Sequence, residues 1–147
     1  MTSYIFSAKG SWHGGWRGHG EIYTNGLHEK ITIDKSMNGL GTGTNPDELL
    51  MSALCSCYMM TLGIRLESES VQYVDIKISS KGIVKKKDGL HFEEIELHPN
   101  LSLNYQPTDE QKKHIYHVMY KAEANCMIAK ALKDNVKLSI YPAITIN

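Results

Sequence analysis

Residues 43–67 read GTNPDELLMSALCSCYMMTLGIRLE, and this stretch decides the fold. Its beginning carries the signals of a helix start. Asn45 is a favoured N-cap residue, Pro46 suits the first helical position, and two acidic residues follow near the positive end of the helix dipole. The residues that follow, to about Glu67, are apolar on almost all sides. Because such a helix belongs in a core rather than on a surface, we expect a buried helix here.

Turn signals place strand pairs on both sides of this helix. Asn25-Gly26 separates two strand-like runs, residues 20–24 and 27–34, and this arrangement predicts a hairpin with a type I′ turn. Asp88-Gly89 marks a second hairpin within residues 71–103. Each hairpin pairs neighbouring strands in antiparallel fashion.

The remaining signals complete an α+β pattern. A capping box at residues 108–111 starts a helix that runs to about Glu123, and a short helix follows Asn125. Residues 136–146 are predicted as a closing strand, and residues 4–9 alternate weakly enough for a first strand. Because the strands come in adjacent runs and do not alternate with helices, the sequence predicts an α+β domain.

Length and charge limit the possible functions. The chain has 147 residues, which fits a single domain over residues 1–147, and it carries 16 basic and 16 acidic side chains. This balance gives no electrostatic case for nucleic acid or anionic lipid, both of which favour a basic excess. The most apolar window, residues 49–66, is broken by polar residues and falls short of a membrane span. We therefore expect neither a nucleic-acid partner nor a membrane partner.

The cysteines are the first candidates for chemistry. Three are too few for a disulfide scaffold, and the chain shows no export signal, so we expect reduced thiols and a cytoplasmic location. Cys57 lies among methionine and leucine residues, where a cysteine is by default a small apolar residue. Cys126 opens a helix, where exposed N–H groups favour thiolate over thiol. The two suit a nucleophile and a resolving partner, with chance placement as the alternative. Cys55 projects to the opposite side of the helix from Cys57.

Arg17 and Asp47 could complete such a site. Arg17 lies in a glycine-rich, aromatic stretch, residues 12–20, whose backbone can approach another group closely. Its guanidinium could stabilise a thiolate, although an ordinary surface arginine is the alternative. Asp47 could hold the guanidinium in a bidentate contact. Asp47 precedes Cys57 by about 15 Å along the helix axis, so a bridging arginine or a second subunit must join them if they serve one site.

Motifs for metals and nucleotides are missing. His114 and His117 are neighbours on one helix face without a third ligand, and the cysteines lack the spacing of a zinc site or a thioredoxin motif. No glycine-rich nucleotide loop occurs. We therefore predict no metal and no bound cofactor. Trp12 and Trp16 either pack internally, which is the interpretation we favour, or form the wall of a pocket.

These motifs resemble the OsmC/Ohr family, the osmotically inducible and organic hydroperoxide resistance proteins. Residues 43–60 are similar to the family's central cysteine motif, and residues 126–132 to its second cysteine motif. Residues 12–20 resemble the family's first strand and arginine loop. The resemblance covers nearly the whole chain and is closer to the general OsmC-like branch.

The resemblance implies an intertwined α+β homodimer in which antiparallel sheets surround a buried central helix. It also implies a thiol-dependent peroxidase of the oxidative stress response, acting on organic hydroperoxides at the subunit interface. Carried over by position, Cys57 is the peroxidatic cysteine, Cys126 the resolving cysteine, Arg17 the activating arginine and Asp47 its carboxylate partner. An external dithiol, typically the lipoyl group of a lipoylated protein, would restore the thiols.

Three positions depart from the family pattern. Asp47 stands where glutamate is usual, Met127 stands where proline is frequent, and Cys55 has no family role. Two other functions remain open beside the peroxidase. One is a non-enzymatic small-molecule binder with Cys57 as packing, and the other is a redox sensor whose disulfide changes a binding surface.

Overall fold

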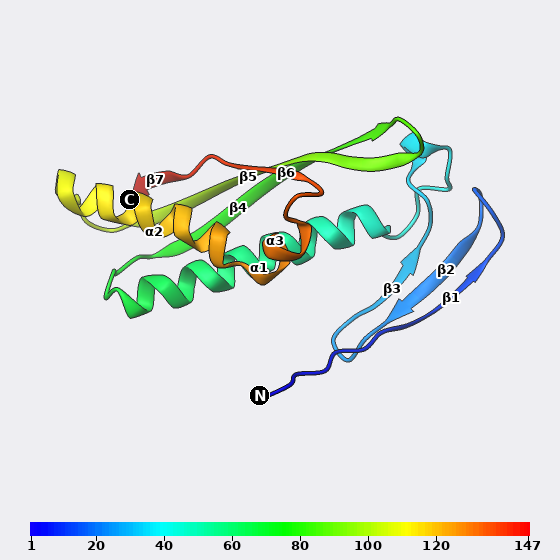
Figure 1. The fold of residues 1–147 in the computed structure, drawn as a ribbon, viewed down its shortest axis with the longest axis horizontal. Helices are drawn as coiled ribbons and strands as arrows, with labels where there is room; N and C mark the ends of the chain where they lie inside the picture. The colour runs from blue at the N-terminus through cyan, green and yellow to red at the C-terminus, as the bar shows by residue number, and fades with distance from the viewer. The chain divides into compact units, whose positions relative to one another are not determined.

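The computed structural model describes all of residues 1–147, which form two compact units, Met1–Leu50 and Met51–Asn147. Each unit is described by itself. Figure 1 shows the strands and helices along the chain, and their order is that of an α+β protein, as the sequence predicts.

The first unit contains a three-stranded antiparallel sheet. Its strands are β1 (Lys9–His13), β2 (His19–Tyr23) and β3 (His28–Ile31), in that spatial order. The predicted first strand over residues 4–9 is wrong, because β1 begins only at Lys9. Residues 4–6 are at least 80% exposed and find no partner strand in the chain.

The β2–β3 hairpin is confirmed, but its turn differs from the predicted type I′. That turn requires positive φ at both central residues, and neither Asn25 nor Gly26 has it. The connection closes through a hydrogen bond from the Thr24 N–H to the Leu27 carbonyl at 2.8 Å. The Gly26 N–H also donates to Thr24 Oγ1 at 3.2 Å.

A loop containing the 3-10 turn η1 (Lys35–Met37) leads into the long helix α1 (Pro46–Ser68). The predicted N-cap is present, since the Glu48 N–H donates to Asn45 Oδ1 at 2.8 Å. Just before the cap, Gly43 has φ of 74°, and a Cβ there would lie 2.3 Å from the Lys30 carbonyl oxygen. Glycine is therefore required where the chain turns into α1.

The second unit contains a mixed sheet built on β5 (Leu90–Leu103). On one edge, β4 (Asp75–Lys86) pairs antiparallel with β5 and with no other strand. On the other edge, β6 (Lys137–Ile140) and β7 (Ala143–Ile146) pair parallel with β5, one after the other. The predicted closing strand is thus split in two, because Pro142 lacks the N–H that a continuous ladder needs.

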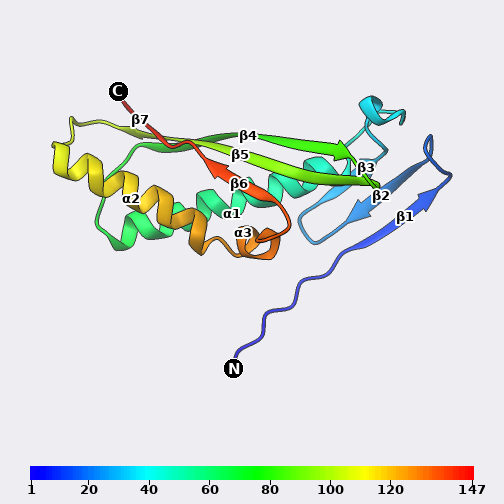
Figure 2. The same cartoon turned by 45° about the horizontal axis from the view of Figure 1, so that its top comes forward.

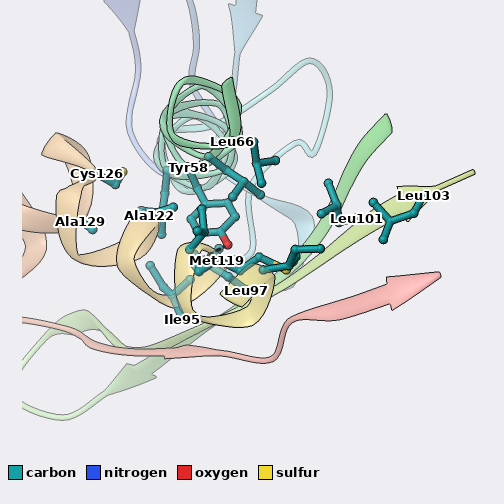
Figure 3. Close-up of a cluster of buried hydrophobic side chains, with 14 residues drawn as sticks. Tyr58, Leu66, Ile95, Leu97, Leu101, Leu103, Met119, Ala122, Cys126 and Ala129 are labelled. Atoms are coloured by element: carbon teal, nitrogen blue, oxygen red, sulfur yellow. Dashed lines mark hydrogen bonds between the residues drawn. The ribbon is translucent and has the colours of Figure 1, made fainter. Parts of the chain in front are cut away.

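Helices cover one face of this sheet, as the two views in Figures 1 and 2 agree. They are α1, α2 (Asp109–Asn125) and α3 (Met127–Leu132), and α2 begins with the predicted capping box at Thr108. Alternate residues of β5 pack with one face each of α1 and α2 to form the core (Figure 3). The core residues are Leu54, Tyr58, Leu62, Leu66, Ile95, Leu97, Leu101, Leu103, Ile115, Val118, Met119, Ala122, Cys126 and Ala129.

Within one chain, α1 is fully buried along one face only. Its buried residues recur every fourth position, whereas Met60 and Ile64 are 68% and 65% exposed. The composition of α1 led us to expect a helix buried on all sides. In a single chain this expectation is wrong, because only one face of α1 is fully buried. Contrary to our expectation for residues 49–66, α1 is long and apolar enough to cross a membrane by length and composition alone, a test that the core helix of a soluble protein also passes.

Candidate active site

The second unit brings the two predicted redox cysteines together. Cys57 is half-buried on α1, and Cys126 is fully buried in the core. Cys126 ends α2 and begins α3, with the extended backbone of a cap residue, and Figure 3 shows it beside Ala122 and Ala129. Hydrogen bonding between the two thiols, with Cys126 as the donor, lowers the pKa of Cys57 and raises the pKa of Cys126, and neither cysteine is in a disulfide.

The Cys57 sulfur accepts further hydrogen bonds from two elements. The backbone N–H groups of Ile128 and Met127 donate to it from the first residues of α3. The Thr61 hydroxyl, one turn further along α1, donates to it as well. Together with the Cys126 thiol, these donors surround the sulfur with groups that stabilise negative charge.

The environment separates the acidities of the two thiols. Burial raises the pKa of the Cys57 thiol, but its hydrogen bonds together outweigh burial and lower the pKa below the ordinary value. Burial, followed by the hydrogen bond to Cys57, raises the pKa of Cys126 to about 11. Cys57 therefore ionises first, and Cys126 keeps its proton and donates it to the hydrogen bond.

This result corrects our expectation for Cys126. Its place at a helix start predicts a thiolate, yet its side chain makes no capping hydrogen bond. The N–H groups of Ala129 and Ile128 lower the pKa of Cys126, but its burial raises that pKa by more. The start of α3 also stabilises a charge on the neighbouring Cys57.

Arg17 lies in the first unit, in the loop at residues 14–18 that connects β1 to β2. The loop is tight, because the Gly18 N–H donates to the Gly15 carbonyl at 2.9 Å and Gly14 has φ of 102°. The Arg17 side chain is exposed, and its Nη1 donates to the Asn38 carbonyl at 3.4 Å. The guanidinium is therefore exposed on this loop, and the long hydrogen bond to the Asn38 carbonyl is its one hydrogen bond.

Asp47 is half-buried at the second residue of α1. No ion pair of the chain includes Arg17 or Asp47, so the structure does not bring these two together within one chain. Their partnership stays a prediction.

Thr61 was not among the functional residues predicted from the sequence, although its hydrogen bonding lowers the pKa of Cys57. Its spacing of four residues from Cys57 puts both on one helix face, and this was the available signal. The donation from Ile128 and Met127 had no such signal, because it depends on how α3 packs beside α1.

The third cysteine is separate from this pair. Its thiol donates to Ser80 Oγ at 3.2 Å, so Cys55 faces β4 and diverges from Cys57, as the helical projection predicts. Of the two histidines considered above as metal ligands, His114 lies 3.5 Å from a Glu69 carboxylate oxygen.

Apolar surface lies on the same helix as the reactive cysteine. Met60 and Ile64 project within about 60° of Cys57 around α1, and both are exposed. Together with Val71 and Tyr73 they line a cavity of about 820 Å³. Met127, next to Cys126 in the chain, is 69% exposed.

The two tryptophans of the first unit do not pack internally in the single chain. Trp12 and Trp16 are 44% and 59% exposed. The Trp12 Nε1–H donates to the Gly14 carbonyl at 2.9 Å, and Trp12 lines a small cavity on the sheet.

Comparison with known proteins identifies the family. Residues 39–140 match the model of the family described as OsmC-like protein. The uncharacterized protein YmaD of Bacillus subtilis is 32% identical over 145 residues, which cover 98% of this chain and 97% of YmaD.

Solved structures share the fold. An organic hydroperoxide resistance protein OsmC from Legionella pneumophila superposes with a TM-score of 0.75 at 17% identity, covering 98% of this chain and all of that one. The organic hydroperoxide resistance protein OhrB of B. subtilis superposes with a TM-score of 0.68 at 22% identity, covering 93% and 98%. At sequence identities of 17% and 22%, these similarities show that the fold is shared. With the match over residues 39–140 and the similarity to YmaD, it shows that the chain belongs to the OsmC-like protein family.

Proposed function

We propose that this protein is a thiol-dependent peroxidase that reduces organic hydroperoxides. The observation that carries the proposal is the packing of Cys57 against the core that contains the buried Cys126, where hydrogen bonding from Cys126 lowers the pKa of Cys57. A thiolate is the nucleophilic form of cysteine, and a neighbouring thiol is what a sulfenic acid needs in order to form a disulfide. The names of the Legionella and B. subtilis proteins with the same fold support this assignment.

The reaction has two steps on the protein. The Cys57 thiolate attacks the terminal oxygen of the hydroperoxide, the O–O bond breaks, and the alkoxide takes a proton to leave as an alcohol. Cys57 is thereby oxidised to a sulfenic acid. The Cys126 sulfur then attacks the Cys57 sulfur, and a Cys57–Cys126 disulfide forms as water leaves with the Cys126 proton.

An external dithiol completes the cycle by thiol–disulfide exchange. A lipoyl group on a lipoylated protein is the reductant we propose. It gives its two thiol hydrogens to Cys57 and Cys126 and becomes a cyclic disulfide. The net reaction turns one hydroperoxide and one dithiol into one alcohol, one water and one disulfide. Because the chain has three free thiols, we place this reaction in the reducing cytoplasm.

In this proposal Arg17 acts on the leaving oxygen, and Asp47 holds Arg17 in place. Asp47 orients the guanidinium, which stabilises the thiolate and donates hydrogen bonds to the departing alkoxide. A homodimer is the proposed assembly, with the exposed apolar side of α1 at the contact between subunits. The apolar side chains near Cys57, including Met60 and Ile64, favour a substrate with an alkyl tail over hydrogen peroxide.

Purified variants test the mechanism. Cys57→Ser should abolish consumption of cumene hydroperoxide with a dithiol reductant. Cys126→Ser should allow one turnover and leave Cys57 oxidised, whereas Cys55→Ser is the matched control and should keep full turnover. Mass spectrometry after one equivalent of hydroperoxide should find a Cys57–Cys126 linkage in the wild type.

Full multiple-turnover activity in both Cys57→Ser and Cys126→Ser would reject the scheme. Oxidation of the wild type without any steady-state turnover would favour the redox sensor instead.

A further inference from the structure

Tyr58 follows Cys57 directly in the chain and carries a hydroxyl group into the core. The side chain is fully buried, and its hydroxyl donates to the Met119 carbonyl at 2.8 Å (Figure 3). Met119 lies in α2, the helix that ends at Cys126. The neighbour of one cysteine in α1 is therefore hydrogen-bonded to the helix that leads to the other cysteine.

The Met119 carbonyl does not need this donor, because a carbonyl in the interior of a helix accepts the N–H four residues further on. The side chains one turn before and after Tyr58 on the buried face of α1, Leu54 and Leu62, are apolar. A phenylalanine would fill the same space, so the hydroxyl adds a hydrogen bond and no further apolar burial. Burial, followed by the charge of Glu123, raises the pKa of Tyr58, so the hydroxyl keeps its proton and stays a donor where thiols ionise.

We propose that Tyr58 is a positioning residue that fixes α2 against α1 and thereby holds Cys126 at Cys57. Apolar contacts between helices are non-directional, whereas a hydrogen bond joins one donor to one acceptor at a defined distance and angle. Cys126 follows Met119 by about 10 Å along the helix axis, and α2 continues to Asn125 without a break. A displacement of α2 at Met119 is therefore passed on to the Cys126 sulfur.

The cysteine pair is sensitive to such a displacement. Hydrogen bonding from Cys126 and from the backbone N–H groups of Ile128 and Met127 lowers the pKa of Cys57. All three donors lie at the junction of α2 and α3, so they move away from the sulfur together, whereas Thr61 belongs to α1 and stays. The effect on the Cys57 pKa does not depend on the proposed function, but an effect on disulfide formation rests on it.

The test measures iodoacetamide labelling of Cys57 in the full chain without peroxide. Tyr58→Phe keeps the ring and removes the hydroxyl, so the pKa of Cys57 should rise and its labelling at pH 7 should slow by about threefold or more. Tyr105→Phe is the matched control, because the Tyr105 hydroxyl also donates to a backbone carbonyl, that of Gln72, at 3.2 Å. Its labelling rate should stay within about twofold of the wild type.

The labelling rate separates positioning from stability, and circular dichroism checks the fold of each variant. If the hydroxyl served stability alone, Tyr58→Phe would melt at a lower temperature but label Cys57 at the wild-type rate. That result, an equal slowing in Tyr105→Phe, or a Tyr58→Phe chain that does not fold would overturn the positioning role.

A second measurement follows the cysteines after one equivalent of cumene hydroperoxide, with dimedone present to trap sulfenic acid. Tyr58→Phe should leave a larger share of oxidised Cys57 as the dimedone adduct and a smaller share as the Cys57–Cys126 disulfide than the wild type. Equal shares in the two proteins would contradict the positioning role. A wild type that the hydroperoxide does not oxidise at all would reject the peroxidase proposal, and the labelling test of Tyr58 would still stand.

Discussion

At the scale of single residues, the two cysteines differ in pKa, which is lowered for Cys57 and raised for Cys126. Cys57 is half-buried and stabilised by hydrogen bonds, whereas Cys126 is fully buried and supplies one of them. Burial acts against charge on both sulfurs, so the difference between them comes from which sulfur receives the donors.

Alkylation should separate the two thiols by pH. The pKa of Cys57 is below its ordinary value, so we expect iodoacetamide to label Cys57 faster than an ordinary cysteine at neutral pH, at a rate that falls as the pH drops below that pKa. The pKa of Cys126 is about 11, so its labelling should stay slow at pH 8 and rise about tenfold per pH unit toward pH 11. Peptide mass spectrometry measures both rates, and equal rates at pH 7 would contradict the assignment.

Replacing Thr61 should change Cys57 without disturbing Cys126. Thr61→Val removes one donor to the Cys57 sulfur while keeping the shape of the side chain, so the pKa of Cys57 should rise. One hydrogen bond is worth about 0.5–1.5 kcal/mol, which corresponds to labelling about two- to tenfold slower at pH 7. Thr61→Ser keeps the hydroxyl and should label at the wild-type rate. A Thr61→Val rate equal to that of wild type would show that the hydroxyl does not support the thiolate.

At the scale of the elements, α1 depends on how it starts. Asn45 is almost fully buried and holds the Glu48 N–H, and Gly43 allows the sharp approach that precedes it. The helix carries Asp47 at this end and Cys57 further along, so the cap fixes the beginning of a functional element.

Asn45→Ala should lower the free energy of unfolding by about 1 kcal/mol, because the Glu48 N–H loses its partner. Asn45→Asp keeps an acceptor at the same place and should stay close to the wild type. Urea unfolding followed by circular dichroism measures both variants. A loss as large in Asn45→Asp as in Asn45→Ala would show that the acceptor is not what matters.

Capping residues and turn residues in the sequence correctly located the starts of two helices and one turn. Asn45 with Pro46 located the start of α1, Thr108 located the start of α2, and Asp88-Gly89 located a turn in which both residues do have positive φ. The type I′ turn predicted at Asn25-Gly26 was wrong, because neither residue has positive φ.

Features that depend on distant partners could not be predicted in this way. Pro142 marks the break between β6 and β7, but the parallel pairing of both strands with β5 had no local signal. The candidate residues of the site came from their motifs. The direction of the Cys126–Cys57 hydrogen bond, in contrast, depends on how deeply the α2–α3 junction is buried.

At the scale of the whole molecule, a single chain leaves large apolar side chains exposed. They occur in the first unit at residues 4–6 and in the second on α1, at Met60 and Ile64. Grouped exposed apolar residues are typical of a surface that another protein covers, and the proposed homodimer supplies one.

Ile64→Glu should therefore convert the proposed dimer into a monomer, because a charge would be buried at the contact without a partner. Leu90→Glu is the matched control, since Leu90 is also exposed but lies at the tip of the β4–β5 hairpin. Sedimentation velocity measures the mass of each variant. A monomeric wild type, or an unchanged dimer in Ile64→Glu, would show that α1 is not the contact.

The pairing of β4 has a consequence for behaviour at high concentration. β4 bonds only to β5, so the backbone groups along its other edge are unpaired within the chain, a feature that in many proteins invites edge-to-edge aggregation. Exposed lysines recur along this strand, at Lys77, Lys81 and Lys85. Their mutual repulsion discourages an approaching strand, so the chain carries its own protection against forming extended β-assemblies.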